Sequence, residues 1–210
     1  MYSISGPVSL TEEELQRLFD ILPRGRDPRS LRDRLLVTIM GLEGLRPIEL
    51  QRTNVGDIVR KDGIVGLTVS TKNRLRNLPL RPDHAQMIDL YLGALRDMGF
   101  PLSDEDPLFV KLRKGRRICV ERLMANTIRS IARRNIDKLD LEGGKTVGPT
   151  LLLRRTAIVL ALMNMPPIIA VMDHIGPRQI DSTLNRYTAN FEERLACLRA
   201  KIIIINIWGS

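Results

Sequence analysis

Arginine, histidine and tyrosine side chains follow one another in the last third of the chain, and these residue types together suit attack on a phosphodiester. Arg154 lies in the string LRRT, His174 follows Asp173, and Tyr187 lies in TLNRYT. A guanidinium donates two parallel hydrogen bonds to phosphate and stays protonated at working pH. A tyrosine hydroxyl can attack phosphorus and form a covalent intermediate, which divides one difficult transfer into two. The order indicates a phosphate clamp with a nucleophile beside it.

Two further cations lie upstream and complete this arrangement. Arg46 occurs in GLRPIEL and Lys72 in STKNRLRNLPL. A catalyst without metal ions must neutralise the charge that builds on the non-bridging oxygens, and the pair Arg46 and Arg154 suits that task. The departing 5′ oxygen needs a proton, which Lys72 can supply. The five residues suit the cutting and rejoining of a DNA strand.

The composition favours one globular domain that binds nucleic acid. The chain has 210 residues, 43% of them hydrophobic, which is enough to bury a core. Its 33 lysines and arginines outnumber its 24 acids and give a formal charge of +9. Nucleic-acid binders carry such a charge, although ribosomal and membrane-surface proteins share it. The charge therefore supports a DNA partner without identifying one.

Cysteine usage and hydropathy indicate a cytoplasmic protein. Cys119 and Cys197 lie far apart and in no CxxC pair, so neither a disulfide framework nor a zinc site is expected. The N-terminus has no basic segment leading into an apolar run, which argues against a signal peptide. The apolar stretch 156–172 is interrupted by Asn164 and two prolines, so it predicts a buried helix and a turn and no membrane span.

The periodicity predicts a mainly helical fold. A capping-box pattern at Thr11 and Glu14 starts a helix that ends before Pro23, and residues 1–8 form a leader. We expect further helices at about 30–44, 82–99, 120–137, 150–163, 168–175 and 183–201, with a loop at 106–110 and a glycine-rich connection at 141–149.

One segment, 57–80, changes to a period near two. It predicts a short strand followed by a hairpin, with IVGLTVS and NLPL flanking a polar tip. The tip carries Lys72, Arg74 and Arg76. The expected fold class is therefore mainly α with a small antiparallel β-sheet, an α+β arrangement.

These residues resemble the catalytic domain of the tyrosine recombinases, also called phage integrases, from about Leu10 to Asn190. The matched strings occur in the family's order. They are Gly44, Leu45, Arg46, Glu49 and Leu50 for the first box; Thr71 and Lys72 with the NLPL string for the hairpin; Leu153, Arg154, Arg155 and Thr156 for the second box; Met172, Asp173 and His174 for the third; and Thr183 with Tyr187 for the last.

The resemblance implies a site-specific DNA recombinase, or integrase, of a mobile element that works through a 3′-phosphotyrosyl intermediate. Arg46 and Arg154 would clamp the phosphate, His174 would assist, Lys72 would protonate the leaving oxygen, and Tyr187 would attack. It implies double-stranded DNA as the partner, a homotetramer on that DNA, and no metal or nucleotide cofactor. The residues expected to bind DNA around the site are Arg74, Arg76 and Arg155.

The resemblance also predicts the domain organisation. Residues 9–200 would form the catalytic domain, and the family's N-terminal core-binding domain would be absent. The tail 201–210 contains IIIINIW, which is too apolar to lie in water. It would fill a groove on its own chain or on a neighbouring subunit, or add a strand to the chain's own sheet.

Three departures from the family pattern bear on activity. Leu151 replaces the histidine three residues before the second arginine, Asp173 replaces a glycine, and His174 and Tyr187 are 13 positions apart, which exceeds the family spacing. Leucine cannot transfer a proton, and one lost acid-base group costs about 10² to 10⁴ in rate. The alternative is therefore a catalytically impaired DNA-binding protein derived from an integrase.

Two other classes of enzyme also cut DNA strands. A type IB topoisomerase shares the chemistry but does not need a specific partner site. A two-metal nuclease or recombinase needs converging carboxylates, and no such cluster emerges from the sequence.

Taken singly, Arg46 could pair with Glu49 at a helix end, and Tyr187 could be a packing residue.

Overall fold

The computed structural model describes residues 8–70, 75–112, 120–141 and 147–164. In chain order its elements are α1 (Glu12–Ile21), α2 (Pro28–Leu42), α3 (Pro47–Arg52), η1 (Val55–Asp57), β1 (Ile58–Lys61), β2 (Ile64–Ser70), β3 (Leu75–Pro79), α4 (Pro82–Asp97), α5 (Ala125–Ile136), η2 (Asp137–Leu139) and α6 (Pro149–Asn164). The predicted fold class, mainly α with a small antiparallel sheet, is confirmed.

The first two helices begin at capping residues. In α1 the Thr11 hydroxyl accepts a hydrogen bond from the Glu14 amide at 3.2 Å, and the Glu14 carboxylate accepts one from the Thr11 amide at 2.7 Å. This is the capping box that the sequence predicts. In α2 the Asp27 carboxylate accepts from the amides of Arg29 and Ser30, both at 3.1 Å. Each cap satisfies donors that have no partner inside the helix.

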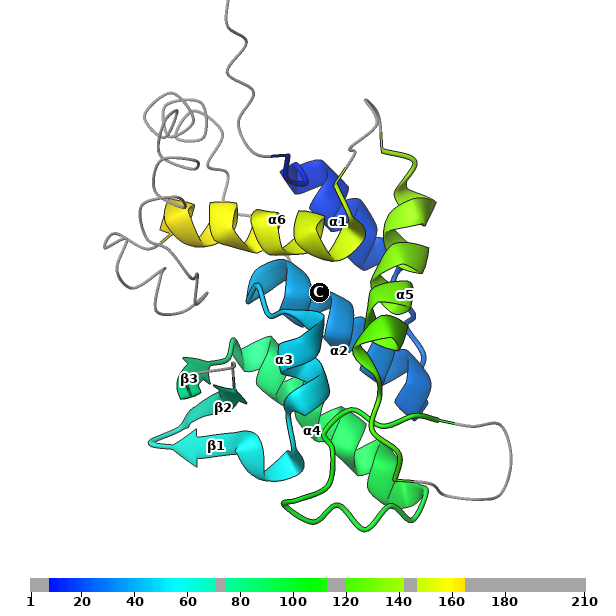
Figure 1. The fold of residues 1–210 in the computed structure, drawn as a ribbon, viewed down its shortest axis with the longest axis vertical. Coiled ribbons are helices and arrows are strands. Elements are labelled where there is room, and N and C mark those ends of the chain that lie inside the picture. The colour runs from blue at the N-terminus through cyan, green and yellow to red at the C-terminus, as the bar shows by residue number, and fades with distance from the viewer. Residues whose placement is uncertain (1–7, 71–74, 113–119, 142–146, 165–210) are drawn as a thin grey trace, which may run out of the picture.

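Helix α2 is the centre of the core. It packs against α6, α4 and α5, and in Figure 1 it lies in the middle of the molecule with α6 crossing above it. Because other elements cover most of its surface, its buried residues lie on nearly all sides and it has no clear polar face. Gly41 leaves room for α6, because a Cβ at this position would lie 3.4 Å from Leu153 Cδ2.

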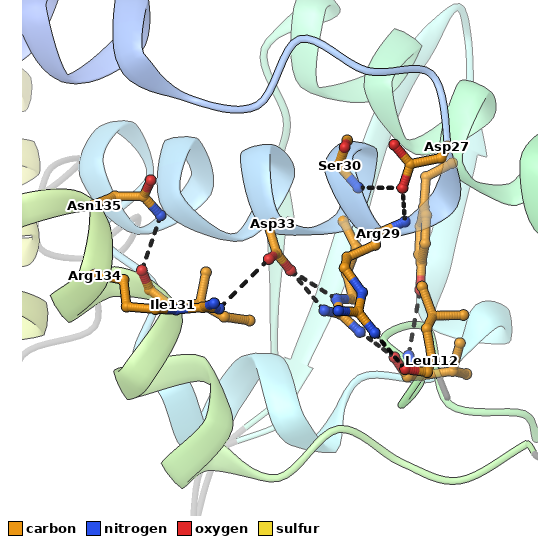
Figure 2. A network of polar contacts seen from close by, with 11 residues as sticks. Asp27, Arg29, Ser30, Asp33, Leu112, Ile131, Arg134 and Asn135 are labelled. Carbon is orange, nitrogen blue, oxygen red and sulfur yellow. Dashed lines mark hydrogen bonds and ion pairs between the residues drawn. The ribbon is translucent and has the colours of Figure 1, made fainter. Parts of the chain in front are cut away.

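A polar network fixes α2 to the segments beside it (Figure 2). The carboxylate of Asp33 lies 2.7 Å from Arg32 Nη2 and 3.8 Å from Arg134 Nη2 of α5. Arg32 Nη1 also donates to the carbonyl of Val110 at 2.9 Å, and Arg29 Nη2 donates to that of Leu112 at 2.9 Å. The network therefore joins α2, α5 and the chain before position 113.

The sheet is a three-stranded antiparallel meander in the order β1-β2-β3. Asp62 and Gly63 join β1 to β2, and both have positive φ, as a type I′ turn requires. Leu67, Val69 and Leu78 are fully buried, and β2 contacts α3 and α4. The predicted strand-plus-hairpin is confirmed, and in Figure 1 the sheet lies beside α3 and α4, below α2.

The structure corrects two predicted boundaries. The helix expected from residue 120 begins at Ala125 as α5, because Val110 and Arg122 form an antiparallel bridge that holds 120–123 extended. The expected loop at 106–110 takes part in that bridge and in a second one, between Asn54 and Pro107. Helix α3 was not expected, because the prediction ended with Arg46 at the end of the preceding helix.

Several predictions fall outside the described residues. They concern residues 1–7 of the leader, the helices at 168–175 and 183–201, and the tail 201–210. Within the described ranges, no helix has the length and apolar character needed to cross a membrane.

Candidate active site

The corner between α2 and α3, residues 43–49, carries the first arginine of the predicted clamp. Gly44 follows the end of α2 with φ 69°, a left-handed conformation that glycine adopts without strain. Arg46 precedes Pro47 and has extended backbone angles, as residues before proline prefer. Pro47 then opens α3 with a ring that suits the first helical position. The string EGLRP thus makes the chain turn sharply at Arg46.

Glu49 holds this corner through two oxygens. Its Oε2 accepts a hydrogen bond from the Arg46 amide at 2.7 Å, and its Oε1 accepts one from Arg46 Nη1 at 3.3 Å. The Glu49 side chain is 2% exposed, whereas that of Arg46 is 36% exposed. The carboxylate therefore lies inside the protein and holds the Arg46 side chain at the surface, where a phosphate can reach it.

Arg76 approaches the same carboxylate from β3. Its Nη2 is 3.6 Å from Glu49 Oε1, and its side chain is 7% exposed. Arg76 belongs to β3 and pairs with Val69 of β2, four positions after Lys72. The sequence predicts Arg76 as a DNA-binding residue at an exposed tip. Its burial favours a different task, which is to hold β3 against α3.

Arg154, the second predicted clamp residue, is buried on α6. Its Nη1 donates a hydrogen bond to the carbonyl of Gly44. Because Arg46 follows Gly44 by two residues, the structure brings the two arginines to the same corner from segments more than a hundred residues apart. The neighbouring residues Leu152 and Leu153 are buried in the core and fix the rotation of α6.

Leu151 and Arg155 lie on the outer side of α6. Leu151 is 45% exposed, and Arg155, one helical turn further on, is half-buried. The residue that replaces the family's histidine therefore faces solvent near Arg154 and does not belong to the core. Arg155 remains a predicted DNA-binding residue.

A buried acid–imidazole pair supports the corner from another direction. Glu43, the last residue before Gly44, accepts a hydrogen bond from His84 Nδ1 at 2.8 Å and one from the Arg81 amide at 3.3 Å. The side chains of Glu43 and His84 are 3% and 1% exposed, respectively. No local pattern in the sequence indicates this pair, because its members are 41 positions apart.

Arg122 holds the far end of α3. Its Nη1 donates to the carbonyls of Gln51 and Thr53 at 2.7 and 3.2 Å, and its Nη2 donates to Asn54 Oδ1 at 2.6 Å. These carbonyls are among those that a helix end leaves without an internal partner. Helix α3 is thus held at its start by its own Glu49 and at its end by Arg122 of the segment before α5.

Four of the predicted site residues lie outside the described ranges: Lys72, Arg74, His174 and Tyr187. The described part contributes two guanidiniums at one corner, held by Glu49 and by the Gly44 carbonyl. Such an arrangement can bind a phosphate and stabilise charge that develops on its oxygens. Within the described residues, no group of three or more His, Cys, Asp and Glu side chains could hold a metal ion.

The chain has relatives both in sequence and in fold. Residues 9–194 match the model of the phage integrase family. Tyrosine recombinase XerA of Pyrococcus furiosus is 30% identical over 122 residues, which cover 58% of this chain and 38% of XerA. The crystal structure of XerH site-specific recombinase bound to palindromic difH substrate, a post-cleavage complex, superposes with a TM-score of 0.71 and 20% identity, over 93% of this chain and 53% of XerH.

A crystal structure of XerA recombinase superposes with a TM-score of 0.68 and 22% identity, over 93% of this chain and 66% of that one. These structures share the fold, and the chain spans less than two thirds of the length of each of these relatives. The family match includes Arg46, Arg154 and the strings around them. The chain belongs to the phage integrase family.

Proposed function

We propose that this chain is a site-specific DNA recombinase that cuts and rejoins strands through a 3′-phosphotyrosyl intermediate. The observation that carries the proposal is the convergence of Arg46 and Arg154 on one corner of the fold. Two guanidiniums from separate helices suit the binding of a single phosphodiester. Membership of the phage integrase family supports the same reaction.

The proposed reaction has two transfers. In the first, the Tyr187 hydroxyl gives its proton to solvent as its oxygen attacks the phosphorus, the bond from phosphorus to the 5′ oxygen breaks, and Lys72 gives a proton to that oxygen. In the second, the 5′ hydroxyl of another strand returns a proton to Lys72 as it attacks the phosphotyrosine, and Tyr187 is released and takes up a proton from solvent. Arg46 and Arg154, with His174, stabilise the charge on the non-bridging oxygens in both transfers.

The proposed partner is double-stranded DNA, on which the chain would assemble as a homotetramer in the cytoplasm. The net charge of +9 supports DNA as partner. The structural relative XerH was solved bound to its difH substrate. Arg74 and Arg155 are proposed to contact the DNA around the cleaved phosphate.

A suicide-substrate assay tests the proposal. Nicked duplexes carrying the ends of the element would be incubated with the protein and denatured, and covalent DNA–protein adducts would be counted on a gel. We expect an adduct that disappears in Tyr187→Phe. DNA binding without any adduct would refute the enzymatic function.

The exposure of Leu151 supports a second candidate. An apolar side chain that is 45% exposed, where the family has a proton-transferring histidine, is consistent with a DNA-binding protein whose cleavage is impaired. This candidate predicts salt-dependent binding to DNA with little or no adduct. The same assay separates the two, because only the enzyme produces an adduct that depends on Tyr187.

A further inference from the structure

Glu43 and His84 connect the arginine corner to the start of α4. Glu43 caps the end of α2 and directly precedes Gly44, whose carbonyl binds Arg154. His84 lies in the first turn of α4, which follows β3 after only two residues. The 2.8 Å hydrogen bond between them therefore joins the segment before Arg46 to the segment that follows β3.

Fold stability alone does not explain a polar pair at this place. Both side chains are almost fully buried, and burying a carboxylate and an imidazole costs free energy that their mutual contact only partly returns. Well-packed apolar residues of similar volume often serve stability equally well or better. What such residues cannot supply is a directional contact that fixes one register between the two segments.

The contacts of Glu43 and Glu49 identify the two segments whose relative position this pair fixes. The Glu43 carboxylate accepts from two groups of the α4 start, the His84 ring and the Arg81 amide. Six positions further on, the Glu49 carboxylate lies against Arg76 of β3. The corner that carries Arg46 is thus bound to the β3–α4 segment by two buried carboxylates, one on each side of the arginine.

We propose that His84, acting through Glu43, is a positioning residue for the phosphate clamp. It holds the backbone of residues 43–46 in place. Arg46 therefore keeps a fixed distance from the Gly44 carbonyl, which is the acceptor for Arg154. His84 does not touch the substrate in this proposal, which rests on the proposed recombinase function. Its loss would misalign the two guanidiniums on the phosphate while leaving the fold and most of the DNA contact intact.

The test compares the double variant E43L/H84L with two others. E43L/H84L removes the hydrogen bond between the two side chains and fills the same volume with apolar groups. H84N keeps a donor close to the position of the imidazole Nδ1. R32M/D33L is the matched control, because it replaces a buried ion pair within helix α2, at 2.7 Å, away from the corner.

Four quantities are measured for each: the single-turnover rate of adduct formation at saturating DNA, the Kd for DNA, the hydrogen exchange of the Arg46 amide, and the urea midpoint of unfolding. For E43L/H84L we expect adduct formation to slow about 100-fold, as misplacement on the scale of 1 Å does. We expect its Arg46 amide to exchange at least about tenfold faster, with an unchanged urea midpoint and Kd. H84N and R32M/D33L should stay within about threefold of the natural chain in the adduct rate, the Kd and the exchange rate of the Arg46 amide.

An E43L/H84L variant that cleaves and exchanges like the natural chain would overturn the inference. So would an unfolded double variant, because the pair would then serve folding and not positioning. If the natural chain forms no adduct, the proposed function fails separately, and the exchange of the Arg46 amide still decides whether the pair positions the corner.

Discussion

The guanidinium of Arg154 donates a hydrogen bond to the carbonyl of Gly44, two residues before Arg46. One arginine of the proposed clamp is therefore bound to the backbone that carries the other. A shift of α6 relative to α2 would move Arg154 away from this carbonyl and disturb both residues together. The clamp depends on the packing of these two helices as much as on its own side chains.

Replacing Arg154 by lysine should show that the forked guanidinium is required. An ammonium cannot hold both the Gly44 carbonyl and a phosphate in fixed geometry. We expect Arg154→Lys to lower the rate of adduct formation by about 10² to 10³. Arg155→Lys is the matched control and should leave the rate almost unchanged, because the charge stays near the DNA. Equal rates for the two variants would contradict a special role for Arg154.

Removing the Glu49 carboxylate should destabilise the fold. Glu49→Ala takes away the acceptor of the Arg46 amide and the carboxylate next to buried Arg76, and we expect the free energy of unfolding to fall by about 3 kcal/mol. Asp89→Ala removes the partner of Arg60 in an exposed pair and should cost less than about 1 kcal/mol. Urea unfolding measures both. Similar losses would mean that Glu49 is not a structural carboxylate.

Restoring the family's histidine should accelerate cleavage. Leu151→His places an acid-base group on the exposed side of α6, where a side chain 45% exposed can change without disturbing the core. We expect the rate of adduct formation to rise by about 10² or more, with an unchanged Kd for DNA. A control, Leu151→Gln, adds polarity without a titrating group. An equal gain in both variants would point to solvation and not to proton transfer.

Tyr91 should make the fold sensitive to alkali. Burial is the main cause that raises the pKa of its phenol to about 12 from a usual value of 10.0. Since the unfolded chain ionises first, the stability that the neutral phenol contributes is complete below pH 10 and is lost as pH rises towards 12. Between about pH 8 and about pH 11.5, the free energy of unfolding should fall by about 2 kcal/mol more in the natural chain than in Tyr91→Phe.

Urea unfolding of both proteins at each pH provides the check. At neutral pH, Tyr91→Phe should itself cost about 1 kcal/mol, because the Val110 amide loses the hydroxyl that accepts its hydrogen bond at 3.3 Å. Parallel pH curves for the two proteins would contradict the prediction, because they would show that the Tyr91 phenol ionises at the same pH in the folded and the unfolded chain.

Local signals in the sequence were sufficient for most of the described elements. Thr11 and Glu14 predict the start of α1 because both halves of the capping box lie within four positions. The change of period at 57–80 predicts the three strands because alternation reports burial on one face. Helix α3, with only six residues, is too short for a period to be seen.

The contacts around the arginines could not be predicted in this way. Arg76 lies in a run of basic residues, a pattern that favours a solvated turn, and its partner Glu49 is 27 positions away. The extended stretch before α5 likewise depends on Val110 and not on its own sequence. Such pairings arise from tertiary packing between distant segments, so a single sequence contains no local signal for them.

The carboxylate of Glu49 is paired with two guanidiniums, one at the surface and one inside. If a phosphate draws Arg46 towards itself, as the proposed function requires, Arg76 can stay beside the carboxylate and keep its negative charge compensated. Release of Arg46 therefore does not leave a lone buried anion, which would cost several kcal/mol. Arg46 can exchange one anionic partner for another, and the interior of the protein remains electrically balanced during the exchange.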